Sequence, residues 1–455
     1  MLNPDIFREY DIRGQADTDL TDDAVHLLGR AFGTHALETG STRCVVGRDV
    51  RLSGPRIRRA LVDGLVSTGI GVVDIGVVPT PVYYFSLFHL DIPAGMMITA
   101  SHNPPPENGF KISLGKTTIH GDAIRSLRTL AESGRFRSGR GTLMETDVIP
   151  AYIAVCRSKV GIPSRLRVVF DPGNGTAGIL LERLFAGTPV EPVFLNLTPD
   201  GNFPSHPPDP TVTKYMRELS DKVLELGADC GIGFDGDSDR IGAADEKGRL
   251  VYADKLLGIL AKDVVSRRPG STVVFDVKCS QGLVEYLESL GARPLMWKTG
   301  HSLVKAKLKE VGGPIAGEMS GHIFIAEDYY GFDDALFAAL RLLRIVATTG
   351  RSLSSLVGEI PAYENTPEIR VGCPEHLKAA VVGELRDYFR RDYEVIDIDG
   401  ARVLFPDGWG LVRASNTQAI LVLRFEARTR ERLAVIQQLF YDRLRRYPEL
   451  SLPNA

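Results

Sequence analysis

One segment of the chain combines a hydroxyl group with residues that stop regular structure. Thr99-Ala100-Ser101-His102-Asn103-Pro104 follows an apolar run, residues 94–98, and precedes two further prolines. Proline continues neither a helix nor a strand ladder, so Ser101 is expected on a stiff turn at the carboxyl end of a strand, where open α/β sheets bind ligands. A polar turn that caps its own backbone is the simpler alternative. We interpret Ser101 as a candidate nucleophile.

Three carboxylates alternate along a second segment, Asp235-Gly236-Asp237-Ser238-Asp239-Arg240. Alternate residues of an extended chain project from one face, and three like charges on that face are costly without a cation. Hard oxygen ligands favour Mg²⁺, which keeps positions open for phosphate oxygens. An EF-hand loop is excluded because its sixth position requires glycine and is Arg240 here. A solvated acidic turn remains the alternative to a magnesium site.

Two further segments suit a sugar phosphate. In residues 317–322, Gly-Glu-Met-Ser-Gly-His, the carboxylate of Glu318 and the hydroxyl of Ser320 can share hydrogen bonds with adjacent sugar hydroxyls. Near the C-terminus, a guanidinium, two hydroxyls, an amide and successive backbone N–H groups suit a phosphate dianion. These groups belong to Arg413, Ser415, Asn416 and Thr417. Considered separately, each segment is equally compatible with ordinary surface residues or a polar β-turn.

A weak internal repeat predicts how these segments are positioned. Short β-branched strands end in Asp within residues 45–49, 168–172 and 273–277, and helical patterns follow at 55–68, 178–184 and 283–290. This alternation predicts three related α/β units with parallel strands and right-handed crossovers. Each unit ends in one more strand and one of the first three segments. We therefore expect these loops to converge on one cleft.

The pattern changes after about residue 362. A helix with Leu377, Val381 and Leu385 on one face precedes several strands between residues 393 and 425, and a last helix follows. This predicts a smaller α+β domain of mainly antiparallel strands. The expected fold is thus three related mixed α/β domains around a central cleft plus a C-terminal α+β domain. The expected ranges are 1–147, 148–251, 252–362 and 363–455.

Composition limits the class of protein. A chain of 455 residues is too long for one core, and a net charge of -3 gives no electrostatic case for nucleic acid or a membrane surface as partner. The apolar stretches are interrupted by charges such as Asp63 and Asp74, so no transmembrane span is expected. Five scattered cysteines without a C-x-x-C pair favour reduced thiols. The acidic first residues are unlike a secretory signal, so we expect a cytoplasmic protein.

Together the four segments resemble the loops of the α-D-phosphohexomutases, in that family's order and over the whole chain. The form Gly-Glu-Met-Ser-Gly-His at 317–322 is typical of the phosphomannomutase/phosphoglucomutase branch. The resemblance implies interconversion of hexose 1-phosphate and hexose 6-phosphate, of mannose, glucose or both. It further implies phosphorylation of Ser101, a bound hexose 1,6-bisphosphate intermediate, and glucose 1,6-bisphosphate as the activator that primes Ser101. The fourth domain is expected to act as a mobile phosphate-binding lid.

The resemblance also implies roles for individual residues. Mg²⁺ would be held by Asp235, Asp237, Asp239 and a phosphoryl oxygen on Ser101. The reacting phosphoryl group would be contacted by Arg13, His102, Lys111 and Arg240, and the substrate by Tyr10, Lys278, His301, Glu318, Ser320, Arg413, Ser415, Asn416 and Thr417. Both His322 and Lys111 are reasonable general bases.

Two positions depart from the family pattern. Ser238 stands where Gly or Ala is usual, and a positive φ there would cost roughly 1 kcal/mol. Ala419 stands where Pro is common, which removes rigidity but no phosphate donor.

Two alternatives remain at this stage. The first is a phosphoglucosamine mutase of the same architecture, which Met319 disfavours because that branch usually has another residue there. The second is a non-catalytic sugar-phosphate sensor, which would need neither Ser101 nor three aspartates. Related bacterial enzymes suggest a monomer.

Overall fold

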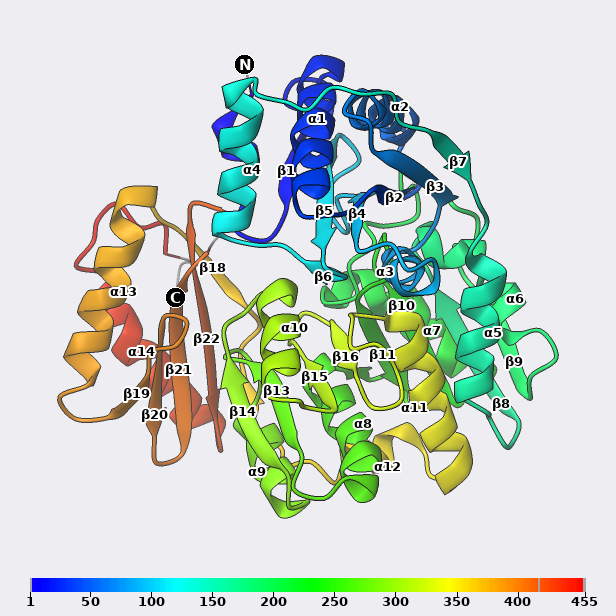
Figure 1. The fold of residues 1–455 in the computed structure, drawn as a ribbon. Coiled ribbons are helices and arrows are strands. Elements are labelled where there is room, and N and C mark those ends of the chain that lie inside the picture. The colour runs from blue at the N-terminus through cyan, green and yellow to red at the C-terminus, as the bar shows by residue number, and fades with distance from the viewer. Residues whose placement is uncertain (1, 416–417, 453–455) are drawn as a thin grey trace.

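The computed structural model of the protein describes residues 2–415 and 418–452. Its four β-sheets follow one another along the chain, each built from one continuous stretch. Figure 1 shows the N-terminal sheet with its helices at the top and the C-terminal sheet at the left. Three α/β units and a smaller α+β unit are present, which confirms the predicted fold class.

The first unit contains a seven-stranded sheet in the order β1-β5-β4-β2-β3-β7, with β6 paired to β5. Its strands are β1 (Ile12–Gln15), β2 (Arg43–Arg48), β3 (Gly71–Val77), β4 (Ala94–Ile98), β5 (Glu107–Leu114), β6 (Thr117–Thr118) and β7 (Leu143–Glu145). Its helices are η1 (Pro4–Ile6), α1 (Asp22–Glu38), α2 (Gly54–Val66), α3 (Thr80–His89) and α4 (Asp122–Ser133). Helix α1 begins after Thr21, whose side chain accepts the Ala24 N–H, and α2 has a proline in its first turn.

The second unit contains a five-stranded sheet in the order β12-β11-β10-β8-β9. Its strands are β8 (Leu166–Asp171), β9 (Val190–Phe194), β10 (Cys230–Phe234), β11 (Ile241–Asp245) and β12 (Leu250–Val251). Its helices are α5 (Ile149–Lys159), η2 (Thr176–Ile179), α6 (Leu181–Phe185), η3 (Thr213–Met216) and α7 (Arg217–Leu226). The helix predicted over 178–184 is divided between η2 and α6, because Gly178 disfavours a regular helix at its start.

The third unit contains a four-stranded sheet in the order β14-β13-β15-β16. Its strands are β13 (Thr272–Asp276), β14 (Arg293–Trp297), β15 (Ile315–Gly317) and β16 (Ile323–Ile325). Its helices are α8 (Ala253–Arg267), α9 (Gln281–Ser289), α10 (His301–Glu310), α11 (Ala335–Thr349) and α12 (Leu353–Val357).

The first three sheets share one feature that positions the chemistry. In each, a parallel strand is followed by an antiparallel one: β4 by β5, β10 by β11, and β15 by β16. The connections are too short for a parallel crossover, so the chain must turn back beside the strand it has just left. These three turns are the serine, aspartate and Glu318 loops, and they occupy the same topological place in the three units.

The fourth unit is antiparallel, in the order β17-β22-β21-β20-β19, with β18 also paired to β22. Its strands are β17 (Glu364–Asn365), β18 (Ile369–Gly372), β19 (Glu394–Ile396), β20 (Ala401–Phe405), β21 (Gly408–Ala414) and β22 (Ile420–Ala427). Helices α13 (Glu375–Phe389) and α14 (Arg430–Leu444) cover one face, and their Phe389 and Phe440 rings stack 4.7 Å apart in a separate core. The other face of the sheet is therefore left for the third unit.

The largest apolar cluster joins the first three units. It runs from Tyr83 and Phe85 of α3 through Tyr152 of α5 to Leu256 of α8 and Leu336 of α11. A shared core holds the three functional loops in fixed relation to one another, whereas the fourth unit packs its own core. Among the helices of the described residues, none is long and apolar enough to span a bilayer.

Candidate active site

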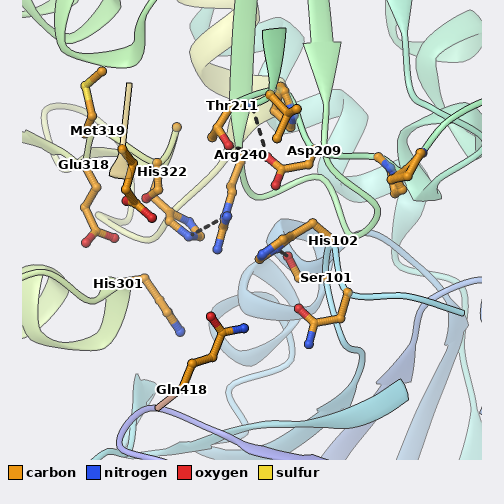
Figure 2. Close-up of a pocket in the computed structure, with 18 of the residues that line it drawn as sticks. Ser101, His102, Asp209, Thr211, Arg240, His301, Glu318, Met319, His322 and Gln418 are labelled. Atoms are coloured by element: carbon orange, nitrogen blue, oxygen red, sulfur yellow. Dashed lines mark hydrogen bonds between the residues drawn. The ribbon is translucent and has the colours of Figure 1, made fainter. Parts of the chain in front are cut away.

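A cleft of about 1390 Å³ opens where the loops of all four units meet. It is lined by these predicted residues: Tyr10, Arg13, Ser101, His102, Lys111, Arg240, Lys278, His301, Glu318, Ser320, His322, Arg413 and Ser415. Figure 2 shows Ser101, His102, Arg240, His322, Glu318 and His301 around this space. The predicted phosphate-binding residues Asn416 and Thr417 lie outside the described residues.

Ser101 lies at the first of the three turns, after β4. Its backbone is left-handed, with φ 52°, and the residue is 2% exposed. Its hydroxyl donates to Asp235 Oδ2 at 2.6 Å and lies 3.1 Å from His102 Nδ1. Gly236 lets the aspartate loop approach this closely, because a Cβ there would lie 2.5 Å from the Ser101 carbonyl oxygen. The loop conformation therefore places the Ser101 hydroxyl directly against the acidic cluster.

Arg51 holds the serine loop and was missed by the sequence analysis. Its guanidinium is fully buried and pairs with Asp49 Oδ2 at 3.1 Å. At distances of 2.6 to 2.9 Å it also donates to four backbone carbonyls, those of Ser101, Asn103, Pro104 and Glu107. The only signal in the sequence was a charged Asp-Val-Arg segment directly after the buried strand β2. A fork-shaped donor is suited to fix several carbonyls at once.

The side chains of Asp235, Asp237 and Asp239 converge in the interior. All three residues are 0% exposed, and each offers a carboxylate oxygen within 4.8 Å of the others. Lys111 Nζ lies 2.7 Å from Asp237 Oδ2 and also pairs with Asp239. Asp237 Oδ1 and Asp239 Oδ1 are buried without a hydrogen-bond partner among the described residues. Oxygen ligands with free lone pairs suit a hard divalent cation, so this acidic cluster could bind a metal.

Burial and neighbouring charges shift the pKa values of residues in this cluster. Burial raises the pKa of Asp235 well above its usual value, and the neighbouring carboxylates Asp237 and Asp239 raise it further. For Lys111, burial alone would lower the pKa, but the negative charges of Asp237 and Asp239 outweigh it and raise the pKa. Lys111 is thus an ammonium cation in this arrangement, with no lone pair to accept a proton.

Ser238 has the positive φ that was considered from the sequence. Its φ is 64°, and its hydroxyl lies 2.8 Å from Thr176 Oγ1. The hydrogen bond is of the same order as the roughly 1 kcal/mol cost of a left-handed serine. Thr176 also donates to the Gly236 carbonyl at 3.2 Å, which ties the aspartate loop to η2 of the same unit.

A chain of side chains orients Arg240 and His322. Arg240 Nε donates to His322 Nε2 at 3.0 Å, so that ring nitrogen carries a lone pair. On the other side, His322 Nδ1 lies 3.1 Å from the buried carboxylate of Asp333. Asp333, which the sequence analysis missed, also binds Lys305 Nζ at 2.8 Å and lies 3.5 Å from His301 Nδ1. Nothing in its sequence position, beside the Asp334 cap of α11, distinguished it.

The remaining first-unit residues face the same space. Arg13 Nη1 donates to Asn103 Oδ1 at 2.8 Å, next to the serine loop. Burial lowers the pKa of His102 well below its usual value, and the positive charges of Arg240 and Arg13 lower it further, so the ring is neutral. The Tyr10 hydroxyl donates to the Thr299 carbonyl at 2.8 Å, which closes the first unit onto the third.

The substrate-binding segments of the third and fourth units are joined. Glu318 Oε1 accepts the Gly300 N–H at 2.6 Å, and burial raises the pKa of this carboxyl. Lys278 Nζ lies 3.3 Å from Glu368 of the fourth unit. Arg413 pairs with Asp399 at 3.0 Å, and Asp399 Oδ2 accepts the Thr299 N–H at the same distance. The predicted phosphate and sugar residues thus meet across one boundary.

Family comparison accounts for nearly the whole chain. Models described as phosphoglucomutase/phosphomannomutase alpha/beta/alpha domains I, II and III match residues 4–138, 150–248 and 252–363, and the C-terminal domain matches 368–443. The chain therefore belongs to the phosphoglucomutase/phosphomannomutase family, an isomerase family, which confirms the resemblance predicted from its loops.

Individual relatives agree with this assignment. The chain is 43% identical to the phosphomannomutase/phosphoglucomutase of Pseudomonas aeruginosa over 455 residues, covering 99% of this chain and 98% of that protein. It is 41% identical to the phosphoglucomutase of Neisseria meningitidis, with coverage of 99% and 98%. A solved phosphoglucomutase/phosphomannomutase family protein from Burkholderia thailandensis superimposes with a TM-score of 0.93 at 41% identity, covering 100% of both chains.

Proposed function

We propose that the protein is a phosphohexomutase that interconverts hexose 1-phosphate and hexose 6-phosphate, of mannose, glucose or both. The observation that carries the proposal is the Ser101 hydroxyl, 2.6 Å from Asp235 of the buried aspartate trio, at the cleft that all four units line. The serine lies against a potential cation site, and sugar-binding and phosphate-binding groups lie opposite it. This arrangement suits a phosphoryl group that is bound covalently to the enzyme between two transfers.

In the proposed reaction the P–O bond of phospho-Ser101 breaks as a bond forms from phosphorus to the free hydroxyl of the hexose monophosphate. The hydroxyl proton passes to a base. The departing Ser101 oxygen takes up a proton, which restores the serine hydroxyl. The resulting hexose 1,6-bisphosphate turns over in the cleft and returns its other phosphoryl group to Ser101. Arg13, Arg240 and Lys111 would offset the charge of the transferring group, and the neutral ring of His102 would lie beside it.

We assign the base to His322. Of the two candidates from the sequence, Lys111 is held as a cation by two carboxylates, whereas His322 Nε2 carries a lone pair. The carboxylate of Asp333, 3.1 Å from Nδ1, would favour the proton on that other nitrogen. The substrate hydroxyl would take the place of the Arg240 N–H on that nitrogen.

The cofactor is proposed to be Mg²⁺, held by Asp235, Asp237 and Asp239 together with a phosphoryl oxygen on Ser101. When bound, it would neutralise charge on the transferring phosphoryl group. Glucose 1,6-bisphosphate would prime Ser101. The proposal includes the domain ranges 1–147, 148–251, 252–362 and 363–455, a monomeric state and a cytoplasmic location.

The substrate-binding part of the proposal assigns the sugar hydroxyls to Glu318 and Ser320, with Lys278 and His301 beside them. The phosphate that does not react is assigned to Arg413, Ser415, Asn416 and Thr417, and Tyr10 closes the cleft over the substrate. The substrate must bind in two orientations during the reaction. The side chains on this side of the cleft include both donors and acceptors, which can hydrogen-bond the sugar in either orientation.

The test is turnover of mannose 1-phosphate, glucose 1-phosphate and glucosamine 1-phosphate, with Mg²⁺ and a trace of glucose 1,6-bisphosphate. We expect turnover of the first two, and we expect Ser101→Ala to abolish it while binding of the sugar phosphates survives. Ser67→Ala, at the end of α2, is the matched serine control and should retain activity. Turnover restricted to glucosamine 1-phosphate would move the protein to the other branch, and normal turnover by Ser101→Ala would exclude the mechanism.

A further inference from the structure

The cleft-facing side of the fourth sheet carries a row of arginines. Residues directly opposite in an antiparallel sheet project from the same face. Arg413 of β21 and Arg370 of β18 both pair with Val422 of β22, and Arg424 lies two residues further along β22. Arg424 and Arg402 of β20 likewise share one pairing partner, Leu411 of β21. Arg424 is therefore a diagonal neighbour of Arg413 on one face, within reach of the same ligand.

Three of these four arginines are already engaged. Arg370 pairs with Glu368 at 3.2 Å, and Arg413 pairs with Asp399 at 3.0 Å. Arg402 donates to the carbonyls of Val277 and Cys279 at 2.6 and 2.8 Å, which anchors the fourth unit on the third. Their charges are thus offset or used to hold the two units together.

Arg424 differs from its neighbours. It lines the cleft and is 5% exposed, yet its guanidinium has no hydrogen bond or ion pair with any residue in the described ranges 2–415 and 418–452, and its Nε is buried without an acceptor.

Two carboxylates on this side, Glu426 and Glu368, bind other residues. Glu426 Oε1 accepts from Ser280 Oγ, Gln281 N and Trp409 Nε1 at 2.8 to 3.0 Å. The other, Glu368, binds Lys278 and Arg370. Glu426 Oε2 is buried without a hydrogen-bond partner, and no ion pair joins either carboxylate to Arg424 among the described residues.

A buried guanidinium without a partner is costly for the folded protein. The cost is offset if an anion enters the cleft beside it. Arg413 cannot supply the whole charge for a phosphate dianion, because Asp399 already offsets it. We infer that Arg424 is an additional phosphate-binding residue, which contacts the phosphate group of the substrate that is not being transferred. This inference rests on the proposed function and adds to it a residue of the substrate-binding set.

The test compares Arg424→Met, which keeps the aliphatic stem, with Arg424→Lys and with Arg430→Met. Arg430 is an exposed arginine of α14 in the same unit, with one surface ion pair to Glu364 at 3.3 Å. Binding of glucose 1,6-bisphosphate is measured by calorimetry in a Ser101→Ala background, where no transfer takes place. Thermal unfolding of the same samples is recorded without ligand.

We expect Arg424→Met to weaken bisphosphate binding by roughly ten- to a hundredfold, the usual range for a charge-assisted contact. We also expect its unfolding temperature to stay equal or to rise, because an unpaired buried charge has been removed. A residue with a purely structural role would lower stability instead. Arg424→Lys should bind with intermediate affinity, and Arg430→Met should match the background protein.

Unchanged bisphosphate affinity in folded Arg424→Met would overturn the inference. If that variant does not fold, Arg424→Lys decides the matter, and an affinity equal to the background protein would overturn the inference. The proposed function is tested separately by turnover of the parent protein. Weaker bisphosphate binding together with an inactive parent would support Arg424 as a phosphate contact while refuting the mutase reaction.

Discussion

Replacing Arg51 is the most informative perturbation of the serine loop. The side chain lies outside the cleft, yet it donates to four carbonyls of residues 101–107 and pairs with Asp49. Arg51→Met removes all of these donors at once. We expect the variant to be less stable and Ser101 to be displaced, while the groups that bind the sugar and its distal phosphate remain in place.

The size of the two effects follows from burial. Breaking a buried ion pair by removing one partner costs about 3–5 kcal/mol, and the Asp49–Arg51 pair has side chains 1% and 0% exposed. Freeing the carbonyls removes the restraint on the left-handed backbone of Ser101. A displacement of about 1 Å at a reacting group costs about 10²-fold in rate. Arg51→Met should therefore lower kcat about 10²-fold, with KM changed by no more than about twofold.

Urea unfolding and steady-state kinetics at a temperature where the variant is fully folded separate these effects. Arg51→Lys keeps a cation for Asp49 but cannot reach four carbonyls, so it should regain most of the stability and less of the rate. Arg59→Met, on the exposed side of α2, is the matched control and should change stability by less than about 0.5 kcal/mol. An unaltered kcat in folded Arg51→Met would refute the reasoning.

Three further predictions concern the aspartate loop, the acidic cluster and the third unit. Ser238→Gly removes the strain of a left-handed serine but also loses the 2.8 Å contact with Thr176, so the free energy of unfolding should change by less than about 1 kcal/mol. Thr176→Val loses the contact without relieving the strain and should destabilise the protein by about 1 kcal/mol. A large loss of stability in Ser238→Gly alone would contradict the expected cancellation of strain and hydrogen bond. Chelation with EDTA should abolish turnover and added Mg²⁺ should restore it, and full activity after exhaustive chelation would exclude a metal in the acidic cluster. Burial raises the pKa of Asp334 to about 6, so its contribution to stability is present below its ordinary pKa and is lost as pH rises through about 6. In urea titrations, the free energy of unfolding of the parent should therefore fall relative to that of Asp334→Asn as the pH rises from the ordinary pKa of aspartate to about 6. Parallel dependence of the two unfolding free energies on pH would contradict the raised pKa of Asp334.

Local chemistry was readable from the sequence because each functional loop is short and continuous. The proline-rich turn after an apolar strand predicted the turn that carries Ser101, although not its burial, and the alternation of Asp235, Asp237 and Asp239 predicted their common direction. The repeat of strand, Asp and helix predicted three related α/β units. In all of these cases the residues that define the feature lie within a few positions of one another, so periodicity and turn chemistry were sufficient.

Tertiary structure decided everything that depends on pairs distant in the chain. Arg51 acts on carbonyls about fifty residues away, and Arg240 meets His322 across 82 positions. Lys111 became a cation rather than a base only because two carboxylates of another unit surround it. Arg424 stands out only because its guanidinium has no hydrogen bond or ion pair with the described residues, whereas the neighbouring Arg370, Arg402 and Arg413 each have at least one. A charged residue has the same appearance in a sequence whether it is solvated, paired or isolated, and its role is set by burial and by the partners that the fold brings to it.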